Sequence, residues 1–322
     1  MDLGIPIKDM KTGPQNILVT GGAGFIGSHL VEYLLERGHD VTVLDNFSTG
    51  QREYLTGLNN LEIIEGDIGD FETVRLALEN ITVIFHLAAL ASVPLSLQAP
   101  QTHFRSNILG TFNLFEAARL QKVQRIIFAS SSAVYGDNQV LSQCDTRAGI
   151  PMSLYAQGKL YGEQLASIYY QVYGLSSVAL RYFNVYGPRQ SPDSAYSGVI
   201  SIFIEQLLNG KRPCIYGDGE QTRDFVYVKD VVEANWCAMT RMREGAYVFN
   251  VGTGKSIRIN QVLELLQKKL ETDFEPQYCP ARKADIRHSC ADVICIREEL
   301  GWQSQWQIED GLKMFLDDEC FF

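Results

Sequence analysis

A glycine-rich run near the N-terminus limits the possible folds of this chain more than any other feature. Residues 20–27 (TGGAGFIG) directly follow an apolar segment, and they lead into residues 25–37, whose apolar side chains recur at helical spacing. Glycines between a strand and a helix allow a tight turn, a close backbone approach to a pyrophosphate and close packing of the helix on the strand. They fit two overlapping spacings, formed by Gly22, Gly24 and Gly27 or by Gly21, Gly24 and Gly27. The run predicts a dinucleotide-binding unit, with a flexible turn as the alternative.

The first half of the chain alternates short apolar runs with amphipathic segments. Strands are predicted at 17–20, 41–44, 61–65, 83–87, 125–130 and 177–182, and helices at 25–37, 71–78, 107–120 and 155–173. No hairpin signal separates the strands. Because this alternation is typical of βαβ units, we predict an α/β fold of the Rossmann type with a doubly wound parallel sheet.

The alternation weakens after Tyr186, where glycine, proline and aspartate become more frequent. Helices are predicted at 199–209, 230–241 and 260–270, and strands at 212–216 and 247–251. We expect a smaller, interleaved C-terminal lobe over the carboxyl ends of the strands, where such sheets bind ligands. The predicted dinucleotide-binding domain is 1–185 with about 225–260, and the predicted substrate-binding lobe is 186–224 with 261–322.

The composition argues against several classes of protein. A net charge of −10 and a pI near 5.1 disfavour a nucleic-acid binder, which needs a basic surface. No apolar run approaches membrane-spanning length, and residues 1–15 lack the apolar segment of a signal peptide. The seven cysteines show no zinc-binding spacing, so we predict no metal site and interpret them as free thiols in a reducing compartment. We therefore expect a cytoplasmic protein.

Acidic and small residues follow the predicted strands, at the edge where a dinucleotide would lie. Asp45 ends the second strand, where its carboxylate can accept hydrogen bonds from an adenosine ribose. A 2′-phosphate would meet a like charge there, so we predict NAD rather than NADP, with a turn-forming aspartate as the alternative. Asp67 ends the third strand and can contact adenine or serve an ordinary turn. The other predicted cofactor contacts are Phe25, Ile26, Asn46, Ile68, Leu87, Ala88 and Ala89.

The chemistry is indicated by a tyrosine, a lysine and a group of serines. Tyr155 and Lys159 are four residues apart in a predicted helix, so they share a face. A neighbouring ammonium favours the phenolate and lowers the pKa of the tyrosine, which lets it take a proton from a hydroxyl. Ser130, Ser131 and Ser132 follow the fifth predicted strand, where a hydroxyl can bind the same substrate oxygen. Each signal alone is common, but this order after a glycine-rich run is rare by chance.

With these motifs the chain resembles the extended short-chain dehydrogenase/reductases, in the branch of nucleotide-sugar epimerases and dehydratases. The resemblance runs from about residue 16 to the C-terminus. The motifs that carry it are residues 21–30 (GGAGFIGSHL), 45–50 (DNFSTG), 86–92 (HLAALAS), 130–136 (SSSAVYG), 155–159 (YAQGK), 180–189 (LRYFNVYGPR) and 217–228 (GDGEQTRDFVYV). Gly158 departs from the pattern, because relatives usually carry serine before the lysine, and this departure can change local packing.

The resemblance implies roles for individual residues. Ser131 matches the catalytic hydroxyl, with its neighbour Ser132 as an alternative. Tyr155 matches the base and Lys159 its partner, and Asn107 matches an asparagine near the catalytic lysine.

The resemblance also implies a site for a nucleotide sugar. Tyr182 matches a residue that contacts the cofactor beside the nicotinamide. Two guanidinium groups, those of Arg223 and Arg282, would give an acidic protein the positive charge that a diphosphate needs. The implied substrate contacts are Ser131, Ser132, Asn184, Val199, Tyr216, Arg223, Arg282 and Ser289.

Members of this branch share a first step, in which the tyrosine removes a proton from the sugar 4-hydroxyl while C4 passes hydride to NAD. Dehydratases and decarboxylases carry an acidic residue two positions before the tyrosine of the 130–136 motif, where this chain has Ala133. The resemblance therefore implies 4-epimerisation, through a transient 4-keto sugar that rotates and takes the hydride back on its other face.

Two segments bear on the sugar. Residues 182–196 (YFNVYGPRQSPDSAY) resemble UDP-N-acetylglucosamine 4-epimerases. Ser289 stands where epimerases restricted to glucose and galactose tend to carry a bulky tyrosine, and a small side chain leaves room for an acetamido group. The first interpretation is therefore an epimerase of UDP-N-acetylglucosamine and UDP-N-acetylgalactosamine, with or without UDP-glucose activity. The second is a UDP-glucose or uronate epimerase, and the third is a non-catalytic, NAD-binding regulatory protein.

The two helices predicted at 107–120 and 155–173 carry apolar residues beyond one face. These residues are Phe112, Leu114, Phe115, Leu160, Tyr161, Leu165, Ile168 and Tyr169. The extra faces can pair with a second subunit in a four-helix interface, and the resemblance also implies a homodimer. The alternative is that both faces are buried within one subunit.

Overall fold

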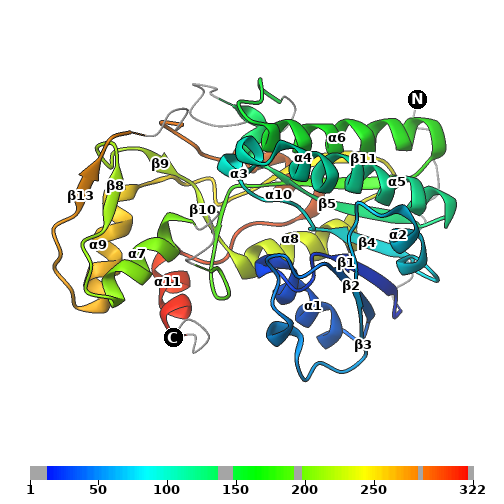
Figure 1. Cartoon of the computed structure of the whole chain (residues 1–322), viewed down its shortest axis with the longest axis horizontal. Helices are drawn as coiled ribbons and strands as arrows, with labels where there is room; N and C mark the ends of the chain where they lie inside the picture. Colours follow the sequence, from blue (N-terminus) through cyan, green and yellow to red (C-terminus); the bar gives the residue numbers. More distant parts are fainter. Residues whose placement is uncertain (1–12, 137–147, 192–197, 282–285, 318–322) are drawn as a thin grey trace.

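In the described part of the chain, seven parallel strands form the central sheet (Figure 1). The computed structural model describes residues 13–136, 148–191, 198–281 and 286–317. The strand order is β11-β6-β5-β4-β1-β2-β3, and each neighbouring pair is parallel. The strands are β1 (Asn16–Thr20), β2 (Asp40–Asp45), β3 (Leu61–Glu65), β4 (Val83–His86), β5 (Arg125–Ser131), β6 (Ser176–Tyr182) and β11 (Ala246–Val251). The predicted α/β fold with a doubly wound parallel sheet is confirmed.

The order of the strands locates the ligand-binding edge. From β1 the chain adds β2 and β3 on one side, and it then crosses over to add β4, β5 and β6 on the other side. Ligands of such sheets lie beyond the carboxyl ends of the strands, where the order reverses. The loops after β1 and β4 meet at this point, because a Cβ on Gly21 would lie 2.7 Å from the backbone N of Ala88.

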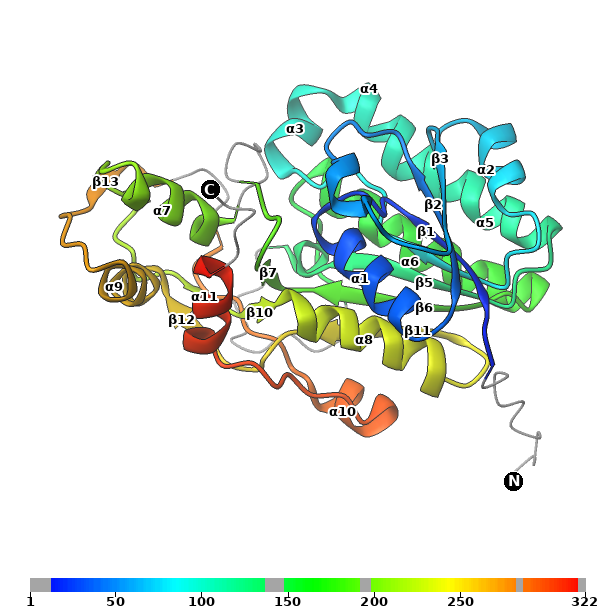
Figure 2. The same ribbon diagram turned by 90° about the horizontal axis from the view of Figure 1, so that it is seen from below.

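Helices cover both faces of the sheet, which explains why the strands are apolar on both sides. Helices α1 (Phe25–Glu36) and α8 (Val228–Arg241) cover one face, and α2 (Phe71–Ala77), α5 (Gly110–Leu120) and α6 (Leu154–Tyr173) cover the other (Figures 1 and 2). Each face has its own apolar core, the first built around Leu30 and Phe85 and the second around Leu18 and Phe115. Within the ranges given above, no helix is long and apolar enough to span a bilayer.

The helix predicted at 107–120 begins at Gly110 as α5, and two short helices and a π-helical turn precede it. Helix α3 (Val93–Gln98) is capped by Ser92, whose side chain accepts a hydrogen bond from Leu95 N, and α4 (Pro100–His103) follows it. The chain then passes through a π-helical turn, η2 (Phe104–Leu109), into α5. The sequence pattern did not predict these two short helices, because each contains a proline. Both prolines lie in the first turn of their helix, where proline is tolerated.

A smaller lobe lies beside the carboxyl ends of the strands (Figure 2). Its core is shared by α7 (Val199–Leu208), α9 (Ile259–Leu270) and α11 (Ile308–Leu316). Its short strands are β7 (Asn184–Tyr186), β8 (Cys214–Tyr216), β9 (Thr222–Arg223), β10 (Phe225–Tyr227), β12 (Ile257–Arg258) and β13 (Gln277–Cys279). The predicted helices at 199–209 and 260–270 and the predicted strand at 212–216 correspond to α7, α9 and β8. The sequence pattern missed α11, and it missed the other short strands because runs of two or three residues carry no clear period.

The chain interleaves the two lobes more than expected. Helix α10 (Ile294–Leu300) lies in the segment 261–322 that was predicted for the substrate-binding lobe. However, Ile296, Leu300 and Trp302 belong to the core between the sheet and α8. Helix α10 therefore packs against the sheet rather than within the smaller lobe. The domain boundaries as a whole stay a prediction.

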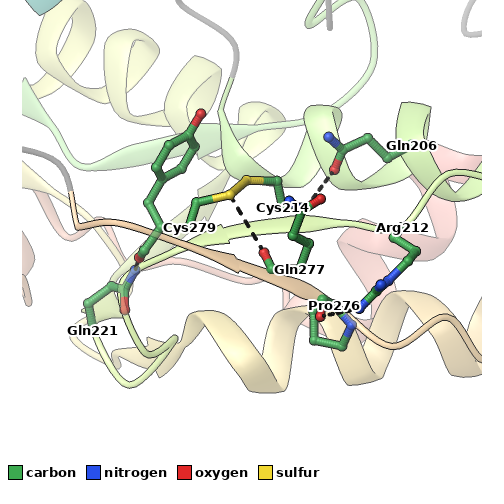
Figure 3. The surroundings of a disulfide bond; sticks show 8 residues. Gln206, Arg212, Cys214, Gln221, Pro276, Gln277 and Cys279 are labelled. Carbon is green, nitrogen blue, oxygen red and sulfur yellow. Dashed lines mark hydrogen bonds between the residues drawn. A yellow bond between two sulfur atoms is a disulfide. The ribbon is translucent and has the colours of Figure 1, made fainter.

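Two cysteines contradict the expectation of free thiols throughout. Cys214 of β8 and Cys279 of β13 form a disulfide across a sequence separation of 65 residues (Figure 3). Parallel pairing of β8 with β13 brings them together, with Cys214 opposite Gln277 and Cys279 opposite Tyr216. Local spacing in the sequence could not reveal this pair, because the contact depends on two strands that only tertiary structure aligns. Cys237 and Cys290 do keep free thiols.

Several apolar residues proposed for a subunit interface are already buried. Leu114, Phe115, Leu165 and Tyr169 are at most 8% exposed, because α5 and α6 pack on each other and on the sheet. For these four, the alternative of burial within one subunit is correct. Phe112 and Ile168 differ, since they are 40% and 52% exposed.

Candidate active site

The glycine-rich loop between β1 and α1 has the geometry that a dinucleotide needs. Gly21 has φ of +72°, which side-chain-bearing residues rarely adopt, and a Cβ on Gly27 would lie 2.1 Å from Gly21 O. Helix α1 begins after Gly24, and no side chain caps its N-terminus. The first-turn N–H groups of Phe25 and Ile26 are therefore available to an anion such as a pyrophosphate. The residues present fit a dinucleotide.

Asp45, at the end of β2, lies against the same loop. Its Oδ2 accepts a hydrogen bond from Ala23 N and its Oδ1 accepts one from Phe47 N, both at 2.9 Å. Burial raises the pKa of the carboxyl, while the two backbone donors act in the opposite direction. Next to it, Asn46 Oδ1 accepts a hydrogen bond from Ser48 N at 3.0 Å and so shapes the turn. The predicted position beside the cofactor loop is thus observed for Asp45.

Asp67 serves the turn after β3. Its Oδ1 accepts a hydrogen bond from Gly69 N at 2.7 Å, which is the turn chemistry considered as the alternative. Its Oδ2 lies 3.7 Å from Arg105 Nε. Ile68 is buried, and its carbonyl accepts a hydrogen bond from Asn113 Nδ2 at 3.0 Å. These contacts fix the loop, and they leave an adenine contact as a prediction.

Buried polar side chains hold the segment after β4. His86 bridges two threonine hydroxyls, those of Thr20 at 2.8 Å and Thr111 at 3.1 Å, and Thr20 Oγ1 also accepts a hydrogen bond from Ala88 N. Asn107 Oδ1 accepts from Leu90 N at 2.7 Å, and its Nδ2 donates to Leu90 O at 3.1 Å. The backbone of Leu87, Ala88 and Ala89 is therefore anchored on both sides.

Gly158 allows α6 to pass close to the helices that carry Asn107. A Cβ at this position would lie 3.0 Å from His103 Nε2 and 3.3 Å from Asn107 Cβ. These neighbours would have to shift for a serine. The departure from the family pattern therefore does alter local packing.

The three predicted catalytic residues converge at the ends of β5 and α6. Ser131 ends β5, Tyr155 lies in the first turn of α6, and a hydrogen bond joins the two side chains. Lys159, one turn further along α6, is 5% exposed and donates from Nζ to Ala129 O at 2.6 Å. Ser96 Oγ accepts a hydrogen bond from Tyr155 N at 3.2 Å, which fixes the start of the helix. Ser132, the alternative to Ser131, begins the short helix η3 (Ser132–Tyr135).

The groups that shift the pKa of Tyr155 differ from the expectation that Lys159 lowers it. Burial raises the pKa of the Tyr155 phenol, and the hydrogen bond with Ser131 opposes this rise. Burial also lowers the pKa of Lys159 to about 7, while the carboxylate of Glu163 opposes that change. Lys159 Nζ lies 5.8 Å from the centre of the Tyr155 ring and points to a carbonyl instead. Ser131 is thus the residue that favours the Tyr155 phenolate in this structure.

A buried ion pair beneath this site was missed by the sequence analysis. Glu163 on α6 and Arg181 on β6 form two hydrogen bonds, at 2.8 and 2.7 Å, and Ser130 Oγ donates to Glu163 Oε1 at 2.5 Å. The only sequence signal was the spacing of four residues between Lys159 and Glu163, which places both on one face of a helix.

The predicted substrate contacts lie on the strands and loops beyond the sheet. Tyr182, the predicted neighbour of the nicotinamide, ends β6 and donates from its hydroxyl to Asn235 Oδ1 at 3.0 Å, and Asn184, a predicted substrate contact, begins β7. Arg223 lies on β9, and the neighbouring Thr222 O accepts a hydrogen bond from Ser289 N at 3.2 Å. This contact places the segment of Ser289 beside Arg223, as expected for one binding surface.

The remaining predicted contacts are more scattered. Val199 begins α7. Tyr216, which is 39% exposed, ends β8 and pairs with Cys279 of β13. Arg282 lies outside the described residues. The structure thus groups Ser131, Tyr155 and Lys159 closely, while Val199 and Tyr216 belong to the smaller lobe.

The chain is similar over most of its length to known 4-epimerases of UDP-sugars. A UDP-glucose 4-epimerase of Mycolicibacterium smegmatis is 40% identical over 300 residues, which are 92% of this chain and 95% of that protein. The structure of a Thermotoga maritima UDP-glucose 4-epimerase with UDP-glucose is 42% identical and has a TM-score of 0.90, covering 94% of this chain and 97% of the other. A UDP-N-acetylglucosamine 4-epimerase from Methanobrevibacter ruminantium M1, in complex with UDP-N-acetylmuramic acid, is 40% identical with a TM-score of 0.90 and the same coverage.

The match extends through the elements that build the site. The model of the NAD dependent epimerase/dehydratase family covers residues 17–252, from β1 and the glycine-rich loop through Ser131, Tyr155 and Lys159 to the end of β11. The chain therefore belongs to the NAD dependent epimerase/dehydratase family.

Proposed function

We propose that the protein is an NAD-dependent 4-epimerase of a UDP-sugar and that its substrate pair is UDP-N-acetylglucosamine and UDP-N-acetylgalactosamine. The observation that carries the proposal is the contact of Ser131 with Tyr155 beside buried Lys159, at the edge of the sheet where the glycine-rich loop lies. Solved relatives that are 40% and 42% identical are 4-epimerases of UDP-sugars, which supports the reaction class.

Each proposed catalytic residue has one task. Tyr155 takes the proton of the sugar 4-hydroxyl and later returns it, and Ser131 holds the same oxygen through its hydroxyl. Lys159, when protonated, adds positive charge next to the phenol and stabilises its ionised form. The glycine-rich loop and Asp45 would hold NAD, which would supply a reversible hydride acceptor for C4, so that the reaction would involve no net oxidation. A sugar that rotates between the two transfers leaves with the opposite configuration at C4.

The residues around Ser131 argue against dehydration or decarboxylation. Those branches of the family carry an acidic residue two positions before Tyr135. Here the segment η3 consists of Ser132, Ala133, Val134 and Tyr135, so it supplies no carboxylate to the sugar. Simple epimerisation needs only the base and the hydride acceptor.

Ser289 supports the acetamido sugar within this class. Its side chain is small and 8% exposed, and its backbone pairs with Thr222 next to Arg223. A diphosphate held by Arg223 would extend its sugar into the same region. Curated relatives include UDP-glucose and UDP-glucuronate 4-epimerases, so these substrates are the competing candidates.

The test is turnover of each UDP-sugar by purified protein without added reductant. We expect UDP-N-acetylglucosamine to yield UDP-N-acetylgalactosamine, detected by chromatography or by the anomeric proton signals in NMR. Conversion of UDP-glucose or UDP-glucuronate alone would assign one of the other epimerase activities. Bound NAD without turnover of any UDP-sugar would favour a regulatory protein.

A homodimer is part of the proposal. Phe112 and Ile168 lie on α5 and α6 and are exposed in the single subunit, so they can cover the same helices of a second copy. Light scattering at micromolar concentration tests this, and a monomeric mass would rule it out. A cytoplasmic location and the expected lack of nucleic-acid and membrane partners stay predictions from the composition.

A further inference from the structure

Glu163 is a buried carboxylate at the centre of the helix that carries Tyr155 and Lys159. It is 6% exposed and lies one helical turn beyond Lys159. Its Oε1 accepts hydrogen bonds from Ser130 Oγ at 2.5 Å and Arg181 Nε at 2.8 Å, and its Oε2 accepts one from Arg181 Nη2 at 2.7 Å. Both carboxylate oxygens therefore accept hydrogen bonds from side chains of the two neighbouring strands β5 and β6.

Each of the elements that Glu163 joins also carries a residue of the proposed site. On β5, Ser130 is followed directly by Ser131, and Ala129 O accepts the hydrogen bond of Lys159. In the sheet Ser130 pairs with Arg181, and the next pair is Ser131 with Tyr182. A single carboxylate thus sets the position of α6 relative to the ends of β5 and β6.

The arginine extends this network to the far edge of the sheet. Arg181 Nη1 donates to Tyr135 OH at 3.0 Å, and Tyr135 OH donates to Asn250 Oδ1 at 2.6 Å. Asn250 Nδ2 in turn donates to Asp292 O at 3.0 Å. Buried ion pairs are weak contributors to stability, and apolar residues of similar volume often replace them without loss. Stability alone is therefore a poor explanation for a charged pair at this position.

We propose that Glu163 is a positioning residue for the epimerase reaction, which holds Lys159 against Ala129 O and Ser131 against Tyr155 in the arrangement for proton transfer. The inference rests on the proposed function. Glu163 does not touch the sugar, so it acts through Lys159 and through the end of β5.

The charge of Glu163 also acts on Lys159. Burial lowers the pKa of Lys159 to about 7, and the carboxylate opposes that change and favours the ammonium. The other titratable or charged groups on elements packed against α6 are His103 of α4, Arg105 of η2, Glu116 and Arg119 of α5, Arg125 of β5, Tyr135 of η3, Arg181 and Tyr182 of β6, and Tyr247 of β11. His86 of β4 also interacts electrostatically with Lys159. Burial lowers the pKa values of His86 and His103, so both are neutral near pH 7, and Arg181 pairs with Glu163 itself.

The first experiment compares Glu163→Gln with the wild-type holoenzyme. We expect kcat to fall by about tenfold or more, with KM for the UDP-sugar and the content of bound NAD changed by less than about twofold. Without the carboxylate the pKa of Lys159 falls, so the basic limb of the kcat profile moves to lower pH. A readout independent of turnover is the titration of Lys159 in protein carrying ¹³C-labelled lysine, with its signal assigned through Lys159→Met. Its midpoint should fall in Glu163→Gln.

The matched control is Glu116→Gln. Glu116 lies on the neighbouring helix and accepts a hydrogen bond from Tyr169 OH of α6 at 3.0 Å, so it also ties a partner helix to α6. Its contact with α6 lies near the C-terminal end of that helix, whereas Tyr155 lies in the first turn, and Glu116 pairs with Arg119 rather than Arg181. This variant should keep the wild-type kcat, pH profile and Lys159 midpoint.

A second variant separates positioning from folding, because Glu163→Gln leaves Arg181 buried without its carboxylate. Glu163→Gln combined with Arg181→Met removes both charges and should regain thermal stability while kcat stays low. Glu163→Asp keeps the charge and should restore the Lys159 midpoint with part of kcat. Wild-type kcat and pH profile in the double variant would overturn the proposal. If the wild type converts no UDP-sugar, the proposed function fails, and an unchanged Lys159 midpoint in Glu163→Gln would still overturn the role of Glu163.

Discussion

The carboxylate of Asp45 accepts a hydrogen bond from the backbone N–H of Ala23 at 2.9 Å, which joins the end of β2 to the glycine-rich loop. An adenosine ribose bound to this loop would therefore lie next to a carboxylate. We predict that the protein prefers NAD and that Asp45→Ala weakens the preference over NADP, because the variant removes a like charge from the 2′-phosphate. Calorimetric Kd values for both cofactors test this. Equal binding of NAD and NADP by the wild type would show that Asp45 does not discriminate.

Tyr155→Phe removes the phenol oxygen that is hydrogen-bonded to Ser131 but keeps the ring. Folding and NAD retention should persist, while kcat should fall by roughly a hundredfold or more, the usual contribution of a general base. Circular dichroism, the NAD content of the purified protein and a turnover assay measure the three quantities. A variant with nearly normal turnover would remove Tyr155 from the mechanism.

His86 should make the fold sensitive to acid. It lies between the hydroxyls of Thr20 and Thr111, and burial lowers its pKa from 6.5 to about 3. Between these two pH values the histidine is protonated in the unfolded chain but neutral in the folded chain. The free energy of unfolding therefore falls as the pH drops through this window. The loss is at most ~1.4 kcal/mol for each pH unit.

His86→Gln removes this titration while its amide can still bond to one of the threonines. Urea unfolding at about pH 7.5 and about pH 5 should show a smaller decrease in stability for the variant than for the wild type. At the higher pH the variant should be the less stable of the two, since one buried hydrogen bond is lost. Parallel decreases in both proteins would mean that another group causes the acid sensitivity.

Much of the site could be predicted because its residues lie at strand ends and helix starts that local patterns reveal. The glycines, Asp45, Ser131, Tyr155 and Lys159 each follow or open an element whose period is readable in the sequence. Glu163 was missed because its partners, Ser130 and Arg181, are brought to it only by the packing of α6 on the sheet. The pKa of Lys159 was missed for the same reason, since burial is a property of the packed state.

Ser289→Tyr tests the choice of sugar. If Ser289 borders the C2 substituent, a tyrosine fills the space that an N-acetyl group needs, and such overpacking costs roughly 1–3 kcal/mol. Turnover of the N-acetylated sugar should fall by about tenfold or more relative to the plain hexose. The measurement is the ratio of kcat/KM values for the two sugars in both proteins. An unchanged ratio would place the specificity elsewhere.

The Cys214–Cys279 disulfide should stabilise the smaller lobe under oxidising conditions. It closes a loop of 65 residues, and chain-entropy estimates for a loop of this length give roughly 4 kcal/mol. Cys214→Ser should lower stability by up to that amount without reductant and make little difference with dithiothreitol. Cys290→Ser makes the same chemical change at a free thiol and serves as the control. Equal stability of wild type and Cys214→Ser without reductant would show that the bridge does not form in solution.

The disulfide, like the contacts of Glu163, could not be predicted from local sequence patterns. Its two cysteines lie in strands of three residues each, too short to show a period, and the pairing of β8 with β13 has no counterpart in the sequence spacing. The small lobe as a whole was less predictable than the sheet for this reason. Its core combines α7, α9 and α11, which are far apart in the chain.

The late position of β11 has a consequence for synthesis on the ribosome. Strand β6 ends at Tyr182, but its partner β11 begins only at Ala246, and Trp302 still later closes the core that β11 shares with α8. A nascent chain that has emerged only to residue 245 therefore exposes an apolar parallel strand with unpaired backbone groups along one edge, a template for aggregation. No single cut can divide this chain into two self-sufficient halves, and fusion partners or split-protein tags belong at its ends rather than at the apparent boundary after Tyr186.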